Sequence, residues 1–211
     1  MRLATNTPTI YLITKGEATP ANFCKKRVEI LDTVGAAAEA GVDLVQLREK
    51  NLPARLIFEL AVAIVALLRG STTRLLINDR ADIAGAAGAD GVQLTSASLG
   101  ADVVRKAFPP DFLIGVSAHS HDDVRQAAAG GADFALFGPV FETPGKGAGT
   151  GVSTLREVCT ATAPLPVMAI GGVDADNFGS VIDAGAVGFA AIRALNDVGQ
   201  LSEFVESVRN N

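Results

Sequence analysis

Several short apolar runs of the sequence lead into side chains that could do chemistry. Gln46, Arg48 and Lys50 occupy alternate positions at the end of one such run, residues 44–47, so their side chains project to one side of an extended chain. Two cations and an amide that converge can bind an anionic group such as a phosphate. The alternative is a solvated segment in which Arg48 pairs with Glu49.

Ionisable residues follow two further apolar runs. Asp79 lies in the sequence Asn78-Asp79-Arg80 and could offer oxygen ligands to Mg²⁺, or could cap a helix that begins after it. His119 lies in a segment that contains both histidines of the chain. Because histidine titrates near neutral pH, His119 is a candidate general acid/base, and an exposed turn residue is the alternative.

A glycine-rich segment, residues 138–151, follows the apolar run 134–137. Glycine lets the chain move and brings backbone amides close to a ligand, so we expect a lid that carries Thr143 and Lys146 over a substrate. A flexible surface loop without such a role is the alternative. The segment is not a P-loop, because the pattern GxxxxGK[ST] is absent.

Two later apolar runs end in residues suited to a phosphate. Gly171 and Gly172 follow residues 167–170, and Ile192 and Arg193 lie at the end of residues 188–192. Loops after the seventh and eighth strands of a barrel frequently bind phosphate through backbone amides, and a glycine pair permits close approach. We therefore expect a phosphate at these four residues, with a charge-assisted contact from Arg193 unless that side chain points to solvent.

The elements that must position these residues are eight apolar runs, which alternate with longer alanine-rich segments of helical period. The runs are nearly all apolar, as strands that are buried on both faces must be. Strict alternation of strand and helix predicts right-handed crossovers and a parallel sheet. We expect the strands at residues 10–13, 44–47, 74–77, 91–94, 113–116, 134–137, 167–170 and 188–192.

A glycine recurs before every second strand, at Gly41, Gly88, Gly131 and Gly185, where it can end a helix in the left-handed conformation. The spacing implies eight strand-and-helix units, which close into an α/β fold, the (β/α)₈ TIM barrel. The rival is an open doubly wound sheet, although no GxGxxG motif opens the first helix. No linker or composition shift indicates a second domain, so we expect one barrel domain over residues 1–211.

The composition limits the function classes. Of the 211 residues, 48% are hydrophobic and 19% are charged, which excludes disorder for most of the chain. The net charge is −5 without a basic run, so we expect no nucleic-acid and no membrane partner. No apolar stretch is long enough to cross a bilayer and no secretory signal is recognisable, so a cytoplasmic protein is expected. Cys24 and Cys159 form no disulfide or zinc pattern and are expected to be buried, and a homo-oligomer is compatible with the sequence.

The motifs at the strand ends together resemble one known superfamily. Five motifs in this order look like the thiamine-phosphate synthase and thiazole tautomerase superfamily. The resemblance implies a TIM barrel that acts on a phosphorylated small molecule in thiamine biosynthesis. The motifs are Gln46-Leu47-Arg48-Glu49-Lys50, Asn78-Asp79-Arg80 with Asp82-Ile83-Ala84, Gly115-Val116-Ser117-Ala118-His119, Gly138-Pro139-Val140-Phe141 with Thr143 and Lys146, and Ala169-Ile170-Gly171-Gly172-Val173.

The resemblance to the synthases implies a magnesium-dependent reaction that joins a pyrimidine-methyl diphosphate to a thiazole phosphate and releases diphosphate. Mg²⁺ and cations would meet the charge that develops on the leaving group. Asp79 would be one of two metal-binding aspartates, but Ser98 stands where the second carboxylate belongs, which weakens a magnesium site. The residues that would hold the diphosphate are Gln46, Arg48, Lys50, Asn78 and Lys146, with Ser117 nearby.

The resemblance to the tautomerases is carried by residues 93–99, by His119-Ser120 and by Val140-Phe141-Glu142-Thr143. It implies a metal-independent aromatisation of a carboxylated thiazole phosphate, in which His119 would carry the proton. Because Ser98 replaces a carboxylate, we favour the tautomerase, which needs no cofactor. The alternatives are the synthase with Mg²⁺ and a non-catalytic homologue that binds the same ligands.

Overall fold

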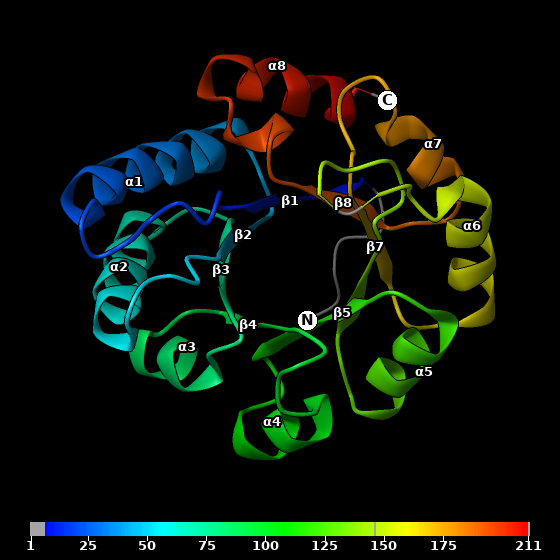
Figure 1. Ribbon diagram of the computed structural model, residues 1–211, viewed down its shortest axis with the longest axis horizontal. Coiled ribbons are helices and arrows are strands. Elements are labelled where there is room, and N and C mark those ends of the chain that lie inside the picture. Colours follow the sequence, from blue (N-terminus) through cyan, green and yellow to red (C-terminus); the bar gives the residue numbers. More distant parts are fainter. Residues whose placement is uncertain (1–6, 146, 211) are drawn as a thin grey trace.

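Eight parallel strands close into a barrel in the computed structural model, which describes residues 7–145 and 147–210. Each strand pairs with the next one in the sequence, and the last pairs with the first. Figure 1 shows the barrel end-on. The strands are β1 (Thr9–Ile13), β2 (Leu44–Leu47), β3 (Arg74–Asn78), β4 (Gly91–Leu94), β5 (Leu113–Ala118), β6 (Phe134–Phe137), β7 (Val167–Ile170) and β8 (Gly188–Ala191).

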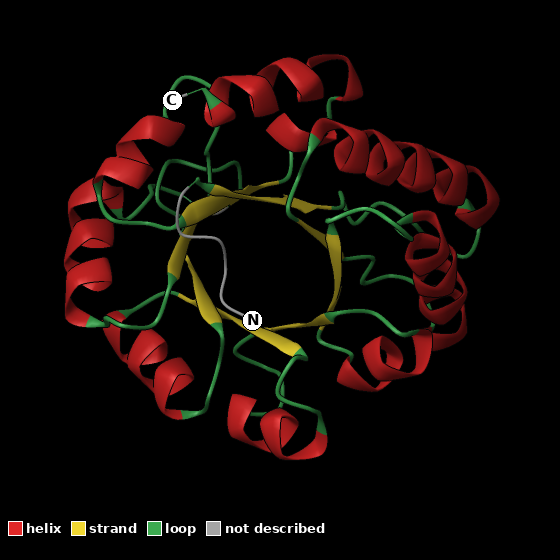
Figure 2. Ribbon diagram, turned by 180° about the vertical axis from the view of Figure 1, so that it is seen from behind, coloured by secondary structure: helices red, strands yellow, loops and turns green. Residues whose placement is uncertain are grey.

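Helices form a ring outside the strands, as Figures 1 and 2 show. They follow the strands one by one, which confirms the predicted (β/α)₈ TIM barrel and excludes the open doubly wound sheet. The helices are α1 (Phe23–Ala40), α2 (Ala54–Leu67), α3 (Ala81–Ala87), α4 (Ala101–Ala107), α5 (His121–Ala129), α6 (Gly151–Ala161), α7 (Phe178–Asp183) and α8 (Val198–Arg209), with the 3₁₀-helix η1 (Ala194–Asn196) before α8.

The core has two layers because alternate side chains of each strand point to opposite faces. One apolar cluster consists of strand residues inside the barrel, such as Tyr11, Leu76 and Phe134. The other lies between the strands and the helices and includes Leu12 and Val34. Since both faces are covered, the strands are mostly apolar, with polar residues such as Gln46 and Gln93 near their carboxyl ends, and this is why short apolar runs predicted them well.

The glycine repeat marks turns at the amino-terminal end of the barrel. Gly41 and Gly88 end α1 and α3 in the left-handed region, with φ of 85° and 73°. Two residues later an aspartate precedes the next strand, and its carboxylate accepts a hydrogen bond from a backbone amide of the strand before. These bonds tie β1 to β2, β3 to β4 and β5 to β6 at the end opposite to the expected site. The pairs are Asp43 with Ile10 at 2.7 Å, Asp90 with Leu75 at 2.8 Å and Asp133 with Ile114 at 2.8 Å.

The two cysteines differ from the expectation that both are buried. Cys24 is exposed in the first turn of α1, off the stripe of Ile30, Val34 and Ala37 that this helix buries. Cys159 is half-buried in α6, and desolvation raises the pKa of its thiol to about 11. Over the ranges that the structure describes, no helix combines the length and the apolar character needed to cross a bilayer.

Candidate active site

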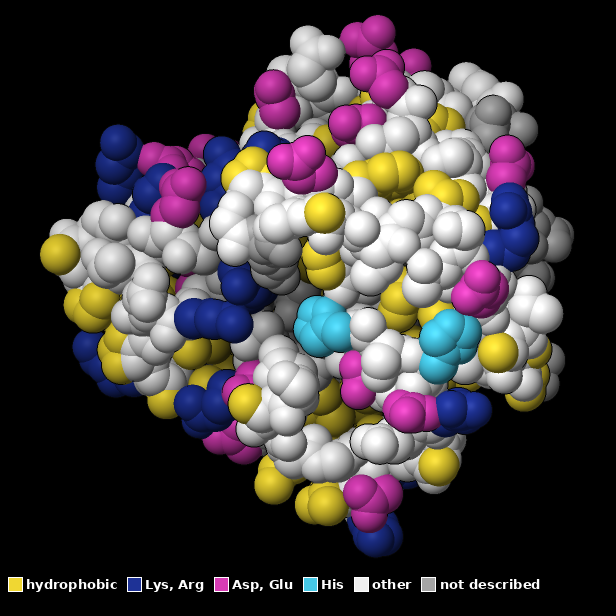
Figure 3. Space-filling model, turned by 45° about the vertical axis from the view of Figure 1, so that its right-hand side comes forward, with side chains coloured by type: hydrophobic (Ala, Val, Ile, Leu, Met, Phe, Trp, Pro, Cys, Tyr) yellow, Lys and Arg dark blue, Asp and Glu magenta, His cyan; other side chains and the backbone are white. Residues whose placement is uncertain are grey.

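A cavity of about 1190 Å³ opens at the carboxyl ends of the strands, which is large enough for two small ligands. This is the end of a TIM barrel at which catalytic residues gather. Figure 3 shows basic side chains and one histidine around a hollow of this surface. Asp79 does not line the cavity, and Lys146 lies outside the described residues. The other predicted site residues all line it: Gln46, Arg48, Lys50, Asn78, Ser117, His119, Thr143, Gly171, Gly172, Ile192 and Arg193.

Amide and hydroxyl side chains form a polar layer between the cavity and the apolar interior of the barrel. The Gln46 amide donates to Oδ1 of Asn78 at 3.1 Å. The fully buried Gln93 donates from Nε2 to Oγ of Ser117 at 3.2 Å, and its Oε1 accepts from the buried hydroxyl of Tyr11 at 3.3 Å. Because Ser117 accepts from below, its own hydroxyl proton is available to a ligand in the cavity.

The basic side of the cavity is formed by the segment that continues β2. Arg48 and Lys50 line the cavity, whereas Glu49 between them is only 3% exposed and faces the loop after β1. The alternative in which Arg48 pairs with Glu49 is therefore wrong. Among the described residues, no carboxylate lies within ion-pair distance of the Arg48 guanidinium. A guanidinium without an acidic partner is suited to an anionic ligand.

Asp79 lies beside this basic side, at the end of β3. Its φ of 60° places it in the left-handed region, which aspartate tolerates better than most residues. Its carboxylate accepts a short hydrogen bond from the hydroxyl of Ser98, and Ser98 in turn accepts from the amide of Thr95 at 2.7 Å. Asp79 does not cap α3, whose first turn has no side-chain cap. In the described part of the chain, no three His, Cys, Asp or Glu residues gather as a metal site.

His119 lies at the opposite side of the cavity mouth, held by the turn between β5 and α5. Ser120 and Asp123 form a capping box at the start of α5, and Asp123 also accepts from the His119 amide at 2.8 Å. That backbone hydrogen bond is the main reason why the pKa of Asp123 lies below its ordinary value. The His119 ring places Nδ1 at 2.5 Å from the carbonyl oxygen of Gly138. If Nδ1 donates there, Nε2 of the neutral ring is a proton acceptor.

The glycine pair after β7 is packed under the loop that follows β6. A Cβ atom added at Gly171 would lie 2.5 Å from Cβ of Pro139, and one at Gly172 would lie 2.7 Å from Cβ of Phe141. Both glycines have positive φ, 99° and 66°. Side chains are therefore excluded here, and the pair forms a wall of bare backbone beside the cavity.

Acidic residues on the β7 and β8 side of the cavity were missed by the sequence analysis. Asp174 and Asp176 line it from the loop after β7, and Asp197 and Glu203 line it near α8. The sequence could have indicated these residues, because they follow β7 and β8, and the ends of these strands were already expected to form the site. The cavity is thus basic on the β2 side and mixed in charge on the β7–β8 side, where Arg193 is the basic residue that lines it.

The sequence matches the family described as thiamine monophosphate synthase over residues 10–195. Thiamine-phosphate synthase of Methanoculleus marisnigri is 41% identical over 182 residues, which cover 85% of this chain and 86% of the relative. A protein of Geobacter sulfurreducens named putative thiamine-phosphate synthase is 45% identical over 170 residues and 79% of each chain. These matches confirm the superfamily resemblance of the five motifs.

A solved structure supports the same assignment. Thiamine phosphate pyrophosphorylase from Pyrococcus furiosus superposes with a TM-score of 0.78 at 30% identity, over 97% of this chain and 98% of that one. Sequence and fold therefore agree over nearly the whole described chain. The chain belongs to the thiamine monophosphate synthase family of enzymes.

Proposed function

We propose that this chain is a thiamine-phosphate synthase, which the sequence analysis gave as an alternative to the tautomerase. The observation that carries the proposal is the basic side of the cavity, where Arg48 has no carboxylate partner among the described residues, next to the amides of Gln46 and Asn78. A diphosphate leaving group needs such a site, because negative charge develops on it as it departs. The names of the relatives support the same choice.

The reaction replaces one bond to carbon by another. The bond between the pyrimidine methyl carbon and a diphosphate oxygen breaks, and its electron pair leaves with the diphosphate. The thiazole nitrogen supplies the electron pair of the new carbon–nitrogen bond. Arg48, Lys50, Gln46 and Asn78 would meet the charge that develops on the leaving oxygen, and preorganised donors of this kind stabilise a transition state strongly.

Magnesium fits the residues on this side. Mg²⁺ is commonly held by one or two carboxylates together with substrate phosphates and water. Asp79 would supply the carboxylate, and the hydroxyl of Ser98 orients it. When bound, the ion would neutralise part of the diphosphate charge. Ser117, whose hydroxyl is directed into the cavity by Gln93, would donate a further hydrogen bond to the same substrate.

The thiazole phosphate would bind on the other side of the cavity. Gly171 and Gly172 offer backbone amides without side chains, and Ile192 and Arg193 lie at the end of the adjacent strand. With Asp174 and Asp176 nearby, a phosphate here depends on these amides and on Arg193 to offset the negative charge. Thr143 and Lys146 would approach the phosphate from the loop after β6, as parts of the predicted lid.

The thiazole tautomerase is retained as a second candidate because of one observation. Nδ1 of His119 lies against the Gly138 carbonyl, which leaves Nε2 as a base at the cavity mouth. Such a base could move the proton in an aromatisation that needs no metal. His119 has no required role in the proposed coupling reaction. A substitution of His119 should therefore slow the aromatisation much more than the coupling.

The decisive experiment mixes the protein with pyrimidine-methyl diphosphate, thiazole phosphate and Mg²⁺ and measures diphosphate release. We expect release that depends on both substrates and falls at least tenfold in Arg48→Ala. In parallel, the carboxylated thiazole phosphate is followed by absorbance. Aromatisation without diphosphate release would establish the tautomerase instead, and turnover in neither assay, with ligands that still raise the Tm, would indicate a non-catalytic binding protein.

A further inference from the structure

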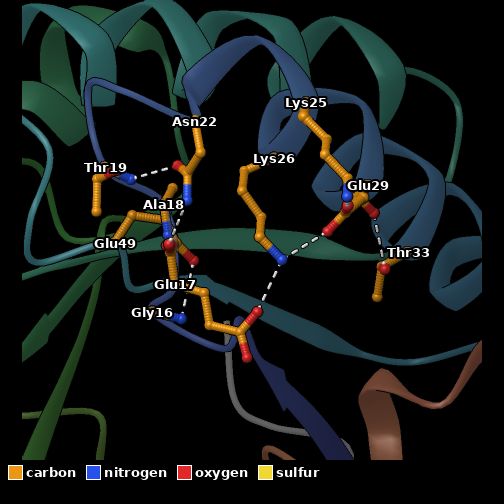
Figure 4. A network of polar contacts seen from close by, with 10 residues as sticks. All are labelled: Gly16, Glu17, Ala18, Thr19, Asn22, Lys25, Lys26, Glu29, Thr33 and Glu49. Atoms are coloured by element: carbon orange, nitrogen blue, oxygen red, sulfur yellow. Dashed lines mark hydrogen bonds and ion pairs between the residues drawn. The ribbon is translucent and has the colours of Figure 1, made fainter.

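Glu49 is a buried carboxylate between the two cations of the basic side. Its neighbours Arg48 and Lys50 face the cavity, while Glu49 is 3% exposed and points the other way. Its Oε1 accepts from the amide of Gly16 at 3.1 Å and its Oε2 from the amide of Ala18 at 2.8 Å. Figure 4 shows the carboxylate held between these two amides of the loop after β1.

The loop that Glu49 holds lies directly against Arg48. The amide of Arg48 donates to Oγ1 of Thr14 at 2.9 Å. A Cβ atom added at Gly16 would lie 3.1 Å from Nη1 and 3.2 Å from the carbonyl oxygen of Arg48. Gly16 has φ of 78°, which also favours glycine. The loop therefore forms one wall of the space that the Arg48 guanidinium occupies.

The far end of this loop is fixed separately. Asn22 accepts from the amide of Thr19 and donates to the carbonyl of Glu17, and Lys26 of α1 pairs with Glu17 at 2.8 Å. These contacts tie residues 17–26 to α1, as Figure 4 shows, but none of them reaches β2. Among the side-chain hydrogen bonds of the described residues, those of Glu49 and Thr14 are what connect the first half of the loop to the Arg48 segment.

We propose that Glu49 is a positioning residue for the anion site, which acts through the loop after β1 to hold the Arg48 guanidinium at the cavity. The inference rests on the proposed function, because it takes diphosphate as the anion. A buried carboxylate is costly unless it is hydrogen-bonded, and here two backbone amides compensate it. Without Glu49, those amides lose their partners and the loop is free to leave Arg48.

The test measures binding of inorganic diphosphate with Mg²⁺ by calorimetry, so that no turnover is needed. We expect Glu49→Ala to raise the Kd about tenfold and Glu49→Gln, which keeps one carbonyl oxygen, to raise it less. In an Arg48→Ala background, Glu49→Ala should add nothing further, because the residue acts through Arg48. An unchanged Kd in both Glu49 variants, or fully additive effects with Arg48→Ala, would overturn the inference.

Asp90→Asn is the matched control. Asp90 is also a carboxylate that accepts from a backbone amide, that of Leu75 at 2.8 Å, but it lies at the other end of the barrel. The substitution Asp90→Asn should lower the Tm and leave the Kd for diphosphate unchanged. This result would separate a positioning role of Glu49 from a general loss of stability. An equal rise of the Kd in Asp90→Asn would mean that Glu49 acts only on stability.

Amide hydrogen exchange of the ligand-free chain decides the inference independently of the proposed function. If the wild-type chain binds no diphosphate, the proposed function is wrong, but the link from Glu49 to Arg48 is still measurable. Glu49→Gln should speed exchange at Gly16, Ala18 and Arg48 and leave Leu75 unchanged. Unchanged exchange at Arg48 would overturn the positioning role.

Discussion

The hydroxyl of Ser98 donates a hydrogen bond to the carboxylate of Asp79, across the gap between the loops that follow β3 and β4. Where the family resemblance leads one to expect two carboxylates, the chain has one carboxylate and one hydroxyl. Two carboxylates in contact repel each other unless a cation lies between them. Ser98 removes that repulsion and orients Asp79, at the expense of one negative charge at the proposed magnesium site.

Ser98→Asp should strengthen magnesium binding. The added charge should lower the Kd for Mg²⁺, measured by calorimetry in the presence of inorganic diphosphate, by on the order of tenfold. Without Mg²⁺ the variant should have a lower Tm than the wild type, because the new carboxylate faces Asp79. Ser96→Asp is the control, since it adds the same charge to an exposed part of the same loop. If both variants bind Mg²⁺ equally, the effect belongs to net charge and not to the pairing with Asp79.

His119→Asn should separate the two candidate activities. In the coupling reaction His119 transfers no proton, so diphosphate release should fall less than tenfold. In a tautomerase, loss of the general base should slow aromatisation by about 10²- to 10⁴-fold. Steady-state kcat and KM of both reactions provide the measurement. His121→Asn, which changes the other histidine of the chain, is the matched control, and a fall of more than a hundredfold in diphosphate release by His119→Asn alone would require a catalytic role in coupling.

The capping box of α5 should give the fold a pH-dependent contribution. Asp123 has a pKa below its ordinary value, chiefly because the His119 amide donates to it. A carboxylate of this kind stabilises the folded state above its unfolded pKa, near 3.9, and that contribution is lost as the pH falls through the folded pKa. Asp123→Asn should therefore cost about 1 kcal/mol at pH 7 and progressively less below about pH 4.

Urea unfolding at a series of pH values checks this prediction. Ser120→Ala removes the other half of the capping box without a change of charge. The cost of Ser120→Ala should stay nearly constant from pH 7 to about pH 4, because Asp123 remains ionised there. A cost of Asp123→Asn that is independent of pH would show that the carboxylate charge contributes nothing.

The strands were predictable because their burial on both faces leaves an apolar run of the right length. The expected ranges 44–47, 91–94, 134–137 and 167–170 match the strands residue for residue, and the other four differ by one or two residues at an end. The residues of the candidate site followed from the same logic, since a barrel brings all the carboxyl ends of its strands together. Their position at the strand ends was sufficient to predict that they lie at one site, without knowledge of any contact between them.

What the sequence did not reveal depends on where a side chain turns after the strand ends. Glu49 could pair with Arg48 next to it or reach the loop after β1, and only the path of that loop decides between them. Ser98 was recognised as a replacement, but its bond to Asp79 depends on the turn of residues 95–98. The acidic residues of the β7–β8 side were overlooked because a phosphate site was expected there.

Asp133→Asn should destabilise the barrel at the end opposite to the site. The Asp133 carboxylate accepts from the amide of Ile114 at 2.8 Å and pairs with the Arg105 guanidinium at 2.6 Å, while Arg105 also donates to the Phe112 carbonyl. Loss of the charge weakens both bonds of this partly buried carboxylate, so the free energy of unfolding in urea should fall by about 1 to 3 kcal/mol. Asp122→Asn is the control: it breaks an exposed ion pair with Arg125 and should change the free energy of unfolding by less than about 0.5 kcal/mol. Because neither residue lines the cavity, the affinity for diphosphate should be unchanged in both variants. If both variants lose the same stability, the hydrogen bond of Asp133 to the Ile114 amide contributes no more than an exposed ion pair does.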